Sequence, residues 1–164
     1  IIRGDTVLYN PKPSWLKLLT LPSYSTPSCK SSNNTEYEYY SILKTTQPDE
    51  NSVILDIGSG IGGPARYLAN KTNSKVYAVE LQKSLNEIGS ELTLNYKLEK
   101  NVFHINADIL EYNFSEIKFN YIVSWLALYH IPKRAELLKI LYNLLDNQGY
   151  MYVEDFYLKK NTSK

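Results

Sequence analysis

Four of the chain's seven glycines lie within six residues, between positions 58 and 63. A continuous apolar run, Val53–Ile57, comes directly before them, and Pro64 follows. Such a run is typical of a strand that is covered on both faces, and proline is favoured in the first turn of a helix. Glycine permits a tight turn and lets a ligand approach the backbone closely. The stretch therefore predicts a strand, a ligand-binding loop and a helix.

The same alternation continues along the chain. Further strands are predicted at 75–80, 102–106, 121–125 and 150–156, and helices at 36–44, 64–70, 84–97 and 132–145, with a turn at 147–149. Alternating strands and helices with short connections are typical of an α/β fold. We predict a Rossmann-like, doubly wound sheet, mostly parallel, with five visible strands. Ligands of such sheets bind beyond the carboxyl ends of the strands, which places the site at the loop after Ile57.

Residues 1–35 have a different character, being rich in proline, serine and asparagine. They are predicted to form an arm or lid with at most a short helix. Residues 36–164 are predicted to form the ligand-binding domain, and 164 residues suit a single core.

The overall charge argues against a nucleic-acid or membrane partner. The net charge is +1, and lysine and arginine are scattered without a long run. No apolar stretch approaches the roughly 20 residues that a membrane span needs, and no signal peptide is apparent. The single cysteine, Cys29, cannot form an internal disulfide, which favours a reducing compartment. We expect a cytoplasmic protein that acts on a small molecule.

Asp56 discriminates between two possible cofactors. Gly58, Gly60 and Gly63 match the G-x-G-x-x-G pattern of dinucleotide sites. A carboxylate two residues before the first glycine would repel a pyrophosphate by on the order of 1–4 kcal/mol. The amino group and sulfonium of S-adenosylmethionine are cationic, so an acid suits that cofactor better. Asp56 could instead cap N–H groups of the loop.

Two more acids follow the next two predicted strands. Glu80 ends the second strand and is placed to bind ribose hydroxyls. Asp108 follows the third strand and could accept a hydrogen bond from an adenine amine, or it could cap a turn. Because the carboxyl ends of parallel strands share one edge, Asp56, Glu80 and Asp108 are predicted to lie along that edge.

The segment LDIGSGIGG, Leu55 to Gly63, resembles motif I of the class I S-adenosylmethionine-dependent methyltransferases, and the Glu80 and Asp108 positions resemble the next two motifs. Within that class, GIGGPARYLA and ALYHI resemble the small-molecule branch, which includes phosphoethanolamine, sarcosine/dimethylglycine, tocopherol and sterol methyltransferases. The resemblance implies methyl transfer from S-adenosylmethionine to a small acceptor, with no metal. It implies cofactor contacts at Asp56, Gly58, Ser59, Gly60, Gly62, Glu80, Leu81, Asp108, Ile109 and Trp125.

His130 follows the fourth predicted strand and is the candidate catalytic base, since histidine titrates near neutrality. In the phosphoethanolamine enzymes, a histidine after strand four is paired with a tyrosine from the N-terminal arm. His130 matches the histidine, whereas the best alignment puts Leu16 at the tyrosine position. His130 could instead cap the helix that follows. Trp125 could stack on adenine or pack in the core, and His104, inside a predicted strand, is expected to be structural.

The family pattern has seven strands, so we expect a C-terminally truncated chain that lacks the last two, which leaves strand five or its neighbour as an unprotected edge. Two other functions remain open. One is a nucleotide (NAD)-dependent oxidoreductase that uses the same glycine loop. The other is a non-catalytic binding protein with a methyltransferase fold. The oligomeric state is left open.

Overall fold

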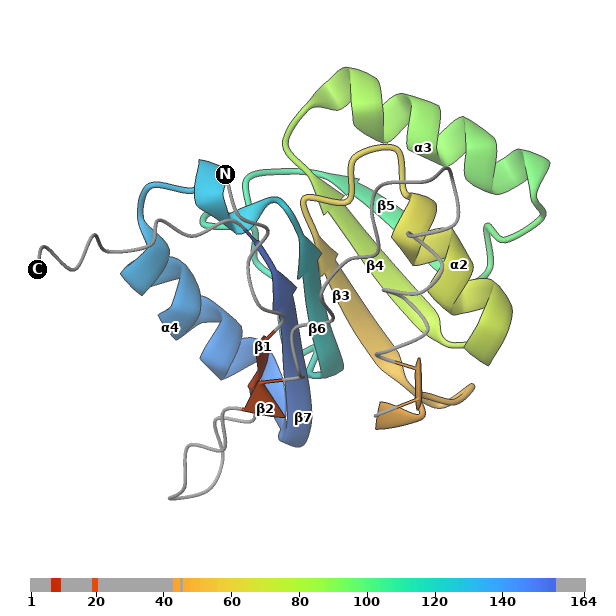
Figure 1. The fold of residues 1–164 in the computed structure, drawn as a ribbon. Coiled ribbons are helices and arrows are strands. Elements are labelled where there is room, and N and C mark those ends of the chain that lie inside the picture. The colour runs from red at the N-terminus through yellow and green to blue at the C-terminus, as the bar shows by residue number, and fades with distance from the viewer. Residues whose placement is uncertain (1–6, 10–18, 21–42, 45, 156–164) are drawn as a thin grey trace, which may run out of the picture.

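The computed structural model describes residues 7–9, 19–20, 43–44 and 46–155 (Figure 1). The strands of the main sheet alternate with helices along the chain. In order, they are β3 (Val53–Ile57), α2 (Gly63–Thr72), β4 (Lys75–Glu80), α3 (Lys83–Asn95), β5 (Val102–Asn106), β6 (Phe119–Trp125), the short 3-10 helix η1 (Leu128–His130), α4 (Arg134–Leu144) and β7 (Leu145–Glu154).

Five of these strands form a parallel sheet in the order β7-β6-β3-β4-β5. Strand order reverses between β3 and its neighbour β6, so the loop after β3 lies at the switch point where ligands of such sheets bind. The predicted Rossmann-like α/β fold is confirmed. The bounds of β3, β4 and β5 agree with the prediction.

The predicted start of β7 is wrong. This strand begins at Leu145, and the predicted turn at 147–149 lies within it. Leu145 pairs with Phe119 and Tyr150 with Tyr121, so β7 carries three more residues than β6 between the two pairs. The register shift absorbs these residues, and Gly149 lies buried against Phe119 and Leu145. The turn residues therefore form an irregularity inside a strand.

Two short strands come from the predicted arm, β1 (Val7–Tyr9) and β2 (Leu19–Thr20). β1 pairs antiparallel with β7 and with β2, which gives a seven-stranded sheet (Figure 1). The prediction of at most a short helix in this segment is therefore wrong. The expected open edge at β7 is wrong for residues 151–153, because β1 pairs with this stretch and satisfies its backbone groups. Of the helix predicted at 36–44, only its last two residues lie among the described ones, and both are helical.

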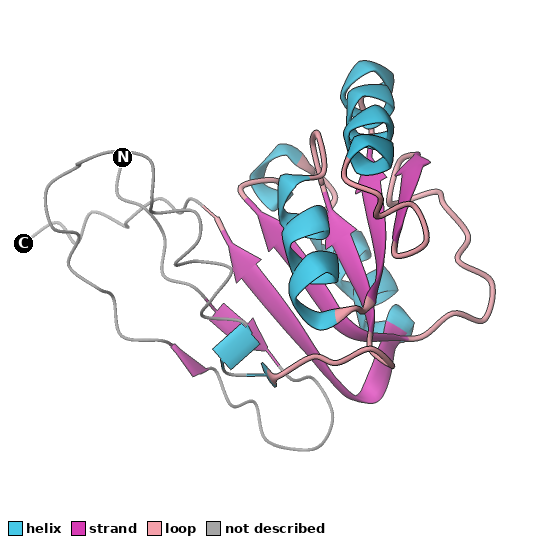
Figure 2. Cartoon of the chain, turned by 90° about the vertical axis from the view of Figure 1, so that its right-hand side faces the viewer, coloured by secondary structure: helices cyan, strands magenta, loops and turns pink. Residues whose placement is uncertain are grey.

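The core has two clusters, one on each face of the sheet, with helices on both sides (Figure 2). Adjacent residues of β3 point to opposite faces, so Ile54 joins the cluster under α2, whereas Leu55 joins the cluster under α4. Leu68 of α2 and Leu137 of α4 are fully buried anchors of these two layers. Within the described residues, no helix has the length and hydropathy to cross a membrane.

Candidate functional site

The α2 face of the sheet carries polar side chains where the strands end. Alternation along each strand directs Asp56 to the same face as Ile54, and Glu80 to the same face as Val76 and Ala78. Trp125 ends β6 on this face, in register with Glu154 of β7. The structure thus brings Asp56, Glu80 and Trp125 to one edge and one face, as predicted for the two acids. No role is predicted from the sequence for Glu154, which the structure places, buried, at the same edge.

The glycine loop lies between β3 and α2 with three left-handed residues. Gly58, Gly60 and Gly62 have φ angles of +68°, +54° and +75°. A Cβ atom at Gly58 would collide with Ala127, whereas a Cβ atom at Gly60 would meet no atom of the described residues within 4 Å. No described side chain therefore blocks the approach of a ligand to the backbone at Gly60. At Gly62, a Cβ atom would lie 2.5 Å from Cε1 of His104, so a packing neighbour also requires this glycine.

Glu80 forms hydrogen bonds both with the glycine loop and with the connection between β4 and α3. Its Oε2 accepts a hydrogen bond of 2.8 Å from the Gly60 amide, and its Oε1 accepts one of 2.8 Å from the Gln82 amide. Both carboxylate oxygens are thus used to hold the backbone. Each oxygen keeps further acceptor capacity, so ribose hydroxyls remain a chemically reasonable additional partner.

Asp56 is 1% exposed, and its Oδ2 has no hydrogen-bond partner among the described residues. Burial and then the charge of nearby Glu80 raise the pKa of Asp56 to about 7. A buried carboxylate of this kind gains from a cationic ligand and loses further from an anionic one. The alternative role, capping of loop N–H groups, has no hydrogen bond to support it within the part of the chain described here.

Ser59 provides a second unsatisfied group at the loop. Its side chain is 5% exposed, and its hydroxyl has no partner among the described residues. Buried polar groups are normally paired, and an exception calls for an explanation such as strain, a catalytic role or a bound partner. The residues present therefore fit a ligand with a cationic group and hydrogen-bonding atoms, as S-adenosylmethionine has.

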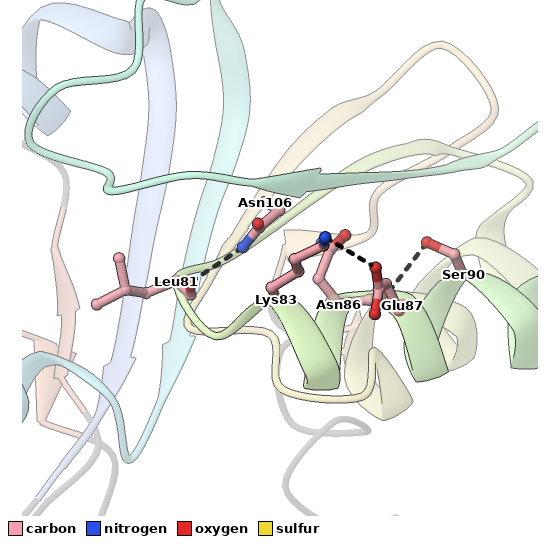
Figure 3. Close-up of polar contacts among 6 residues, drawn as sticks. All are labelled: Leu81, Lys83, Asn86, Glu87, Ser90 and Asn106. Carbon is pink, nitrogen blue, oxygen red and sulfur yellow. Dashed lines mark hydrogen bonds and ion pairs between the residues drawn. The ribbon is translucent and has the colours of Figure 1, made fainter.

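The residues predicted to surround adenine differ in what they contact. Oδ1 of Asp108 accepts a hydrogen bond of 2.9 Å from the Leu110 amide. This oxygen therefore caps a turn, which is the alternative role considered for Asp108. Ile109 is 5% exposed and lies in the core cluster under α4. Leu81 is 67% exposed, and its side chain extends away from α3 (Figure 3). Its carbonyl accepts a hydrogen bond of 3.0 Å from Asn106, which fixes the backbone there.

The first turns of α3 border this region. Lys83 and Glu87 form an exposed ion pair of 3.6 Å, and the Ser90 hydroxyl donates to the Asn86 carbonyl (Figure 3). Asn86 is buried, and its Nδ2 has no partner among the described residues. The buried face of α3 consists of Asn86, Gly89 and Thr93.

Trp125 is partly buried, and its ring centroid lies 5.7 Å from that of Tyr152. It packs against the core cluster under α2, so the core-packing alternative has direct support. Stacking on adenine stays a prediction.

His130 is exposed at the end of η1, on the loop that follows β6. Its ring lies 3.8 Å from the Tyr129 ring, centroid to centroid. The Tyr129 amide donates a 2.7 Å hydrogen bond to Oδ2 of Asp155, and the Tyr129 carbonyl accepts one of 3.2 Å from Arg134. The turn that carries His130 is therefore held by hydrogen bonds to Asp155, the residue after β7, and to Arg134, the first residue of α4. Neither contact is predicted from the sequence: Asp155 lies 26 positions from Tyr129 and is brought there by the fold, whereas Arg134 is five positions away but carries no motif.

A family described as methyltransferase domains matches residues 54–149. Phosphoethanolamine N-methyltransferase 2 of Caenorhabditis elegans is 31% identical over 100 residues, covering 61% of this chain and 23% of that protein. Phosphoethanolamine N-methyltransferase of Plasmodium falciparum (isolate 3D7) is 30% identical over 118 residues, covering 70% of this chain and 43% of that protein. The chain thus spans less than half the length of either relative.

Solved structures show the same relationship. Haemonchus contortus phosphoethanolamine N-methyltransferase 2, in complex with phosphomonomethylethanolamine and S-adenosylhomocysteine, has a TM-score of 0.66 and 29% identity, covering 71% of this chain and 27% of that one. These findings confirm the resemblance that the glycine loop and its neighbouring acids indicated. The chain belongs to the methyltransferase-domain family, among relatives of the S-adenosylmethionine-dependent small-molecule methyltransferases.

Proposed function

We propose that the protein is an S-adenosylmethionine-dependent methyltransferase that acts on a small-molecule acceptor. The observation that carries this proposal is the buried carboxyl group of Asp56, close enough to Glu80 for the charge of Glu80 to raise its pKa. A cation placed beside this pair relieves both burial and repulsion, whereas the pyrophosphate of NAD would add negative charge. The proposed cofactor has the cationic groups that the pair favours.

The proposed site uses the loop and the edge of the sheet. The backbone at Gly60 and the Ser59 hydroxyl, which has no partner among the described residues, receive the amino-acid part of the cofactor, next to Asp56. Glu80 binds the ribose while it keeps its hold on the loop. When bound, the cofactor supplies a methyl group that is already activated on a sulfonium. The protein holds the acceptor in line with that methyl group and excludes water.

We further propose His130 as the base. In the transfer, a bond forms between the acceptor atom and the methyl carbon, and the carbon–sulfur bond breaks with its electron pair going to sulfur. The acceptor's proton passes to an imidazole nitrogen of His130. The fastening of its turn by Asp155 and Arg134 supports a fixed position for this ring.

Phosphobases and small amines are the proposed acceptor class, because the relatives from C. elegans and P. falciparum are named as phosphoethanolamine N-methyltransferases. A net charge of +1 without basic clusters argues for a small molecule over nucleic acid. A single cysteine is consistent with the proposed cytoplasmic location.

Two measurements on the intact protein test the proposal. Calorimetry should detect binding of S-adenosylhomocysteine and no binding of NADH. Stabilisation by NADH alone would overturn the cofactor assignment. A screen of phosphoethanolamine, sarcosine and sterols for release of S-adenosylhomocysteine then identifies the acceptor class. Tight cofactor binding without turnover on any acceptor would favour the non-catalytic alternative.

A further inference from the structure

His104 lies behind the glycine loop, in a position that the proposed function does not use. It belongs to β5, and alternation along the strand directs it to the α2 face, like Val102. Its Nε2 lies 2.8 Å from the Thr93 hydroxyl on the buried face of α3. The ring is thus held from the helix side by a hydrogen bond.

Two glycines leave room for this ring, one in the loop and one in α3. A Cβ atom at Gly62 would lie 2.5 Å from Cε1 of His104, and a Cβ atom at Gly89 would lie 2.7 Å from the same atom. Cβ contacts of this length do not occur without a shift of one partner. The imidazole ring therefore fills the space between the glycine loop and α3. It fits there because neither Gly62 nor Gly89 has a side chain.

Arg66 joins the same two segments beside the ring. Its Nη1 donates a hydrogen bond of 2.6 Å to the Ile61 carbonyl and one of 3.3 Å to the Gly89 carbonyl. The guanidinium group also lies over the Tyr96 ring, 5.8 Å from its centroid. The loop residues Ile61 and Gly62 are therefore held by a guanidinium group and by an imidazole ring.

His104 acts here as an uncharged group. Burial and then the charge of Arg66 lower the pKa of His104 to about 4, so the ring is neutral at physiological pH. Its Nδ1 is buried and has no hydrogen-bond partner among the described residues. The interaction with the loop is thus one of shape and packing.

We propose that His104 is a positioning residue for the cofactor, because its ring supports Gly62 from behind and keeps the glycine loop in the shape that binds the ligand. The inference rests on the proposed location of the cofactor at the glycine loop. It extends that proposal to a residue that touches neither cofactor nor acceptor. Without the ring, the loop gains freedom that binding must then remove, and affinity falls.

The first experiment measures the Kd of S-adenosylhomocysteine by calorimetry on the intact protein, for the parent, His104→Ala and Val102→Ala. Val102 is buried two residues earlier on the same face of β5, so its truncation reports a general loss of packing. We expect His104→Ala to weaken binding at least about tenfold. Val102→Ala should lower Tm while Kd of the folded protein stays unchanged. His104→Gln, which can keep the hydrogen bond to Thr93, should recover part of the affinity. If His104→Ala fails to fold, the Kd of His104→Gln tests the proposal instead.

A second experiment tests the match between the ring and α3. Gly89→Ala alone should weaken binding, because the added methyl group displaces the ring. In the His104→Ala background, the same substitution should cost less, since both colliding ring atoms are gone and only the contact with the Ile61 backbone at 3.1 Å remains. Equal costs in both backgrounds would contradict the proposed packing.

The outcomes separate this inference from the proposed function. Parent-like affinity in both His104→Ala and His104→Gln overturns the positioning role. Gly60→Ala tests the site itself, since a Cβ atom there would enter the space assigned to the ligand. Loss of binding in Gly60→Ala with no effect at His104 would leave the site in place and remove only the inference. Parent-like binding in Gly60→Ala would overturn the site and, with it, the role of His104.

Discussion

Glu80 accepts a hydrogen bond of 2.8 Å from the backbone amide of Gly60, although the two residues lie 20 positions apart in the chain. The acid at the end of one strand thus fixes the loop that follows its neighbour. Its second oxygen holds Gln82 at the start of the next connection. Glu80 therefore shapes the site before any ligand arrives.

Replacing Glu80 by glutamine should weaken S-adenosylhomocysteine binding by about 10- to 100-fold, which corresponds to a charged hydrogen bond. Glutamine has one acceptor oxygen, so the amide of Gly60 or of Gln82 would face an NH₂ group. Calorimetry at pH 7 gives the Kd. Glu87→Gln on the surface of α3 is the comparison, because its exposed ion pair with Lys83 contributes little. Equal affinities of the two variants would contradict the role of Glu80.

Asp56→Asn should change how stability depends on pH. The pKa of Asp56 rises from 3.8 in the unfolded chain to about 7 in the folded one, so folding takes up a proton between these values. The free energy of unfolding of the parent therefore falls as pH rises from about 4 to about 7. The variant lacks this contribution, and its stability should fall less.

Urea unfolding at pH 5 and pH 8 measures this difference. Asp49→Asn is a suitable control, because hydrogen bonds lower the pKa of Asp49 and place its titration below this range. The Asp56 variant should also bind S-adenosylhomocysteine more weakly than the parent, because the cationic amino group loses its partner. Identical pH profiles for the parent and Asp56→Asn would show that the carboxyl group is not perturbed.

Gly58→Ala should destabilise the protein more than Gly60→Ala does. Both positions have positive φ, which costs alanine roughly 1–2 kcal/mol. Among the described residues, the new methyl group at Gly58 meets a neighbour, Ala127, and that at Gly60 meets none, so overpacking adds about 1–3 kcal/mol at Gly58. Thermal unfolding of both variants without ligand gives the comparison. Equal losses of stability in the two variants would mean that the loop around Ala127 moves aside without a cost in free energy.

His130→Gln should lower kcat by roughly 10²- to 10⁴-fold, the usual contribution of general base catalysis. The residue is exposed, so Tm and the Kd of S-adenosylhomocysteine should both stay at the parent values. Steady-state turnover on the acceptor found by screening provides the rate. A kcat near that of the parent would remove His130 from the mechanism.

Asp155→Ala should reduce kcat by about tenfold, because the turn that carries His130 would shift. Small displacements of a catalytic group lower the rate strongly. The Tyr129 amide loses its acceptor in this variant. Asp155→Asn keeps an acceptor oxygen and should restore most of the rate. If both variants lose activity equally, the charge of Asp155 matters more than its bond to Tyr129.

The sequence predicts the strands that surround the glycine loop because their signals are local. The apolar run before Gly58 and the acids Asp56 and Glu80 are read directly from neighbouring residues. The roles of Gly62, Asp155 and β1 depend on contacts between distant segments. The sequence predicts a ligand contact at Gly62, and only the fold shows that the ring of His104 also requires a glycine there.

The pairing of β1 with β7 sets an order of events during synthesis. Val7 pairs with Val153, so this contact cannot form until almost the whole described chain has left the ribosome. The parallel strands β3 and β4, which are near neighbours in sequence, can associate much earlier. Long-range contacts also form slowly, because a large loop must close first. A pulse-labelling experiment on nascent chains should therefore find β1 protected last, although it is translated before the other described strands.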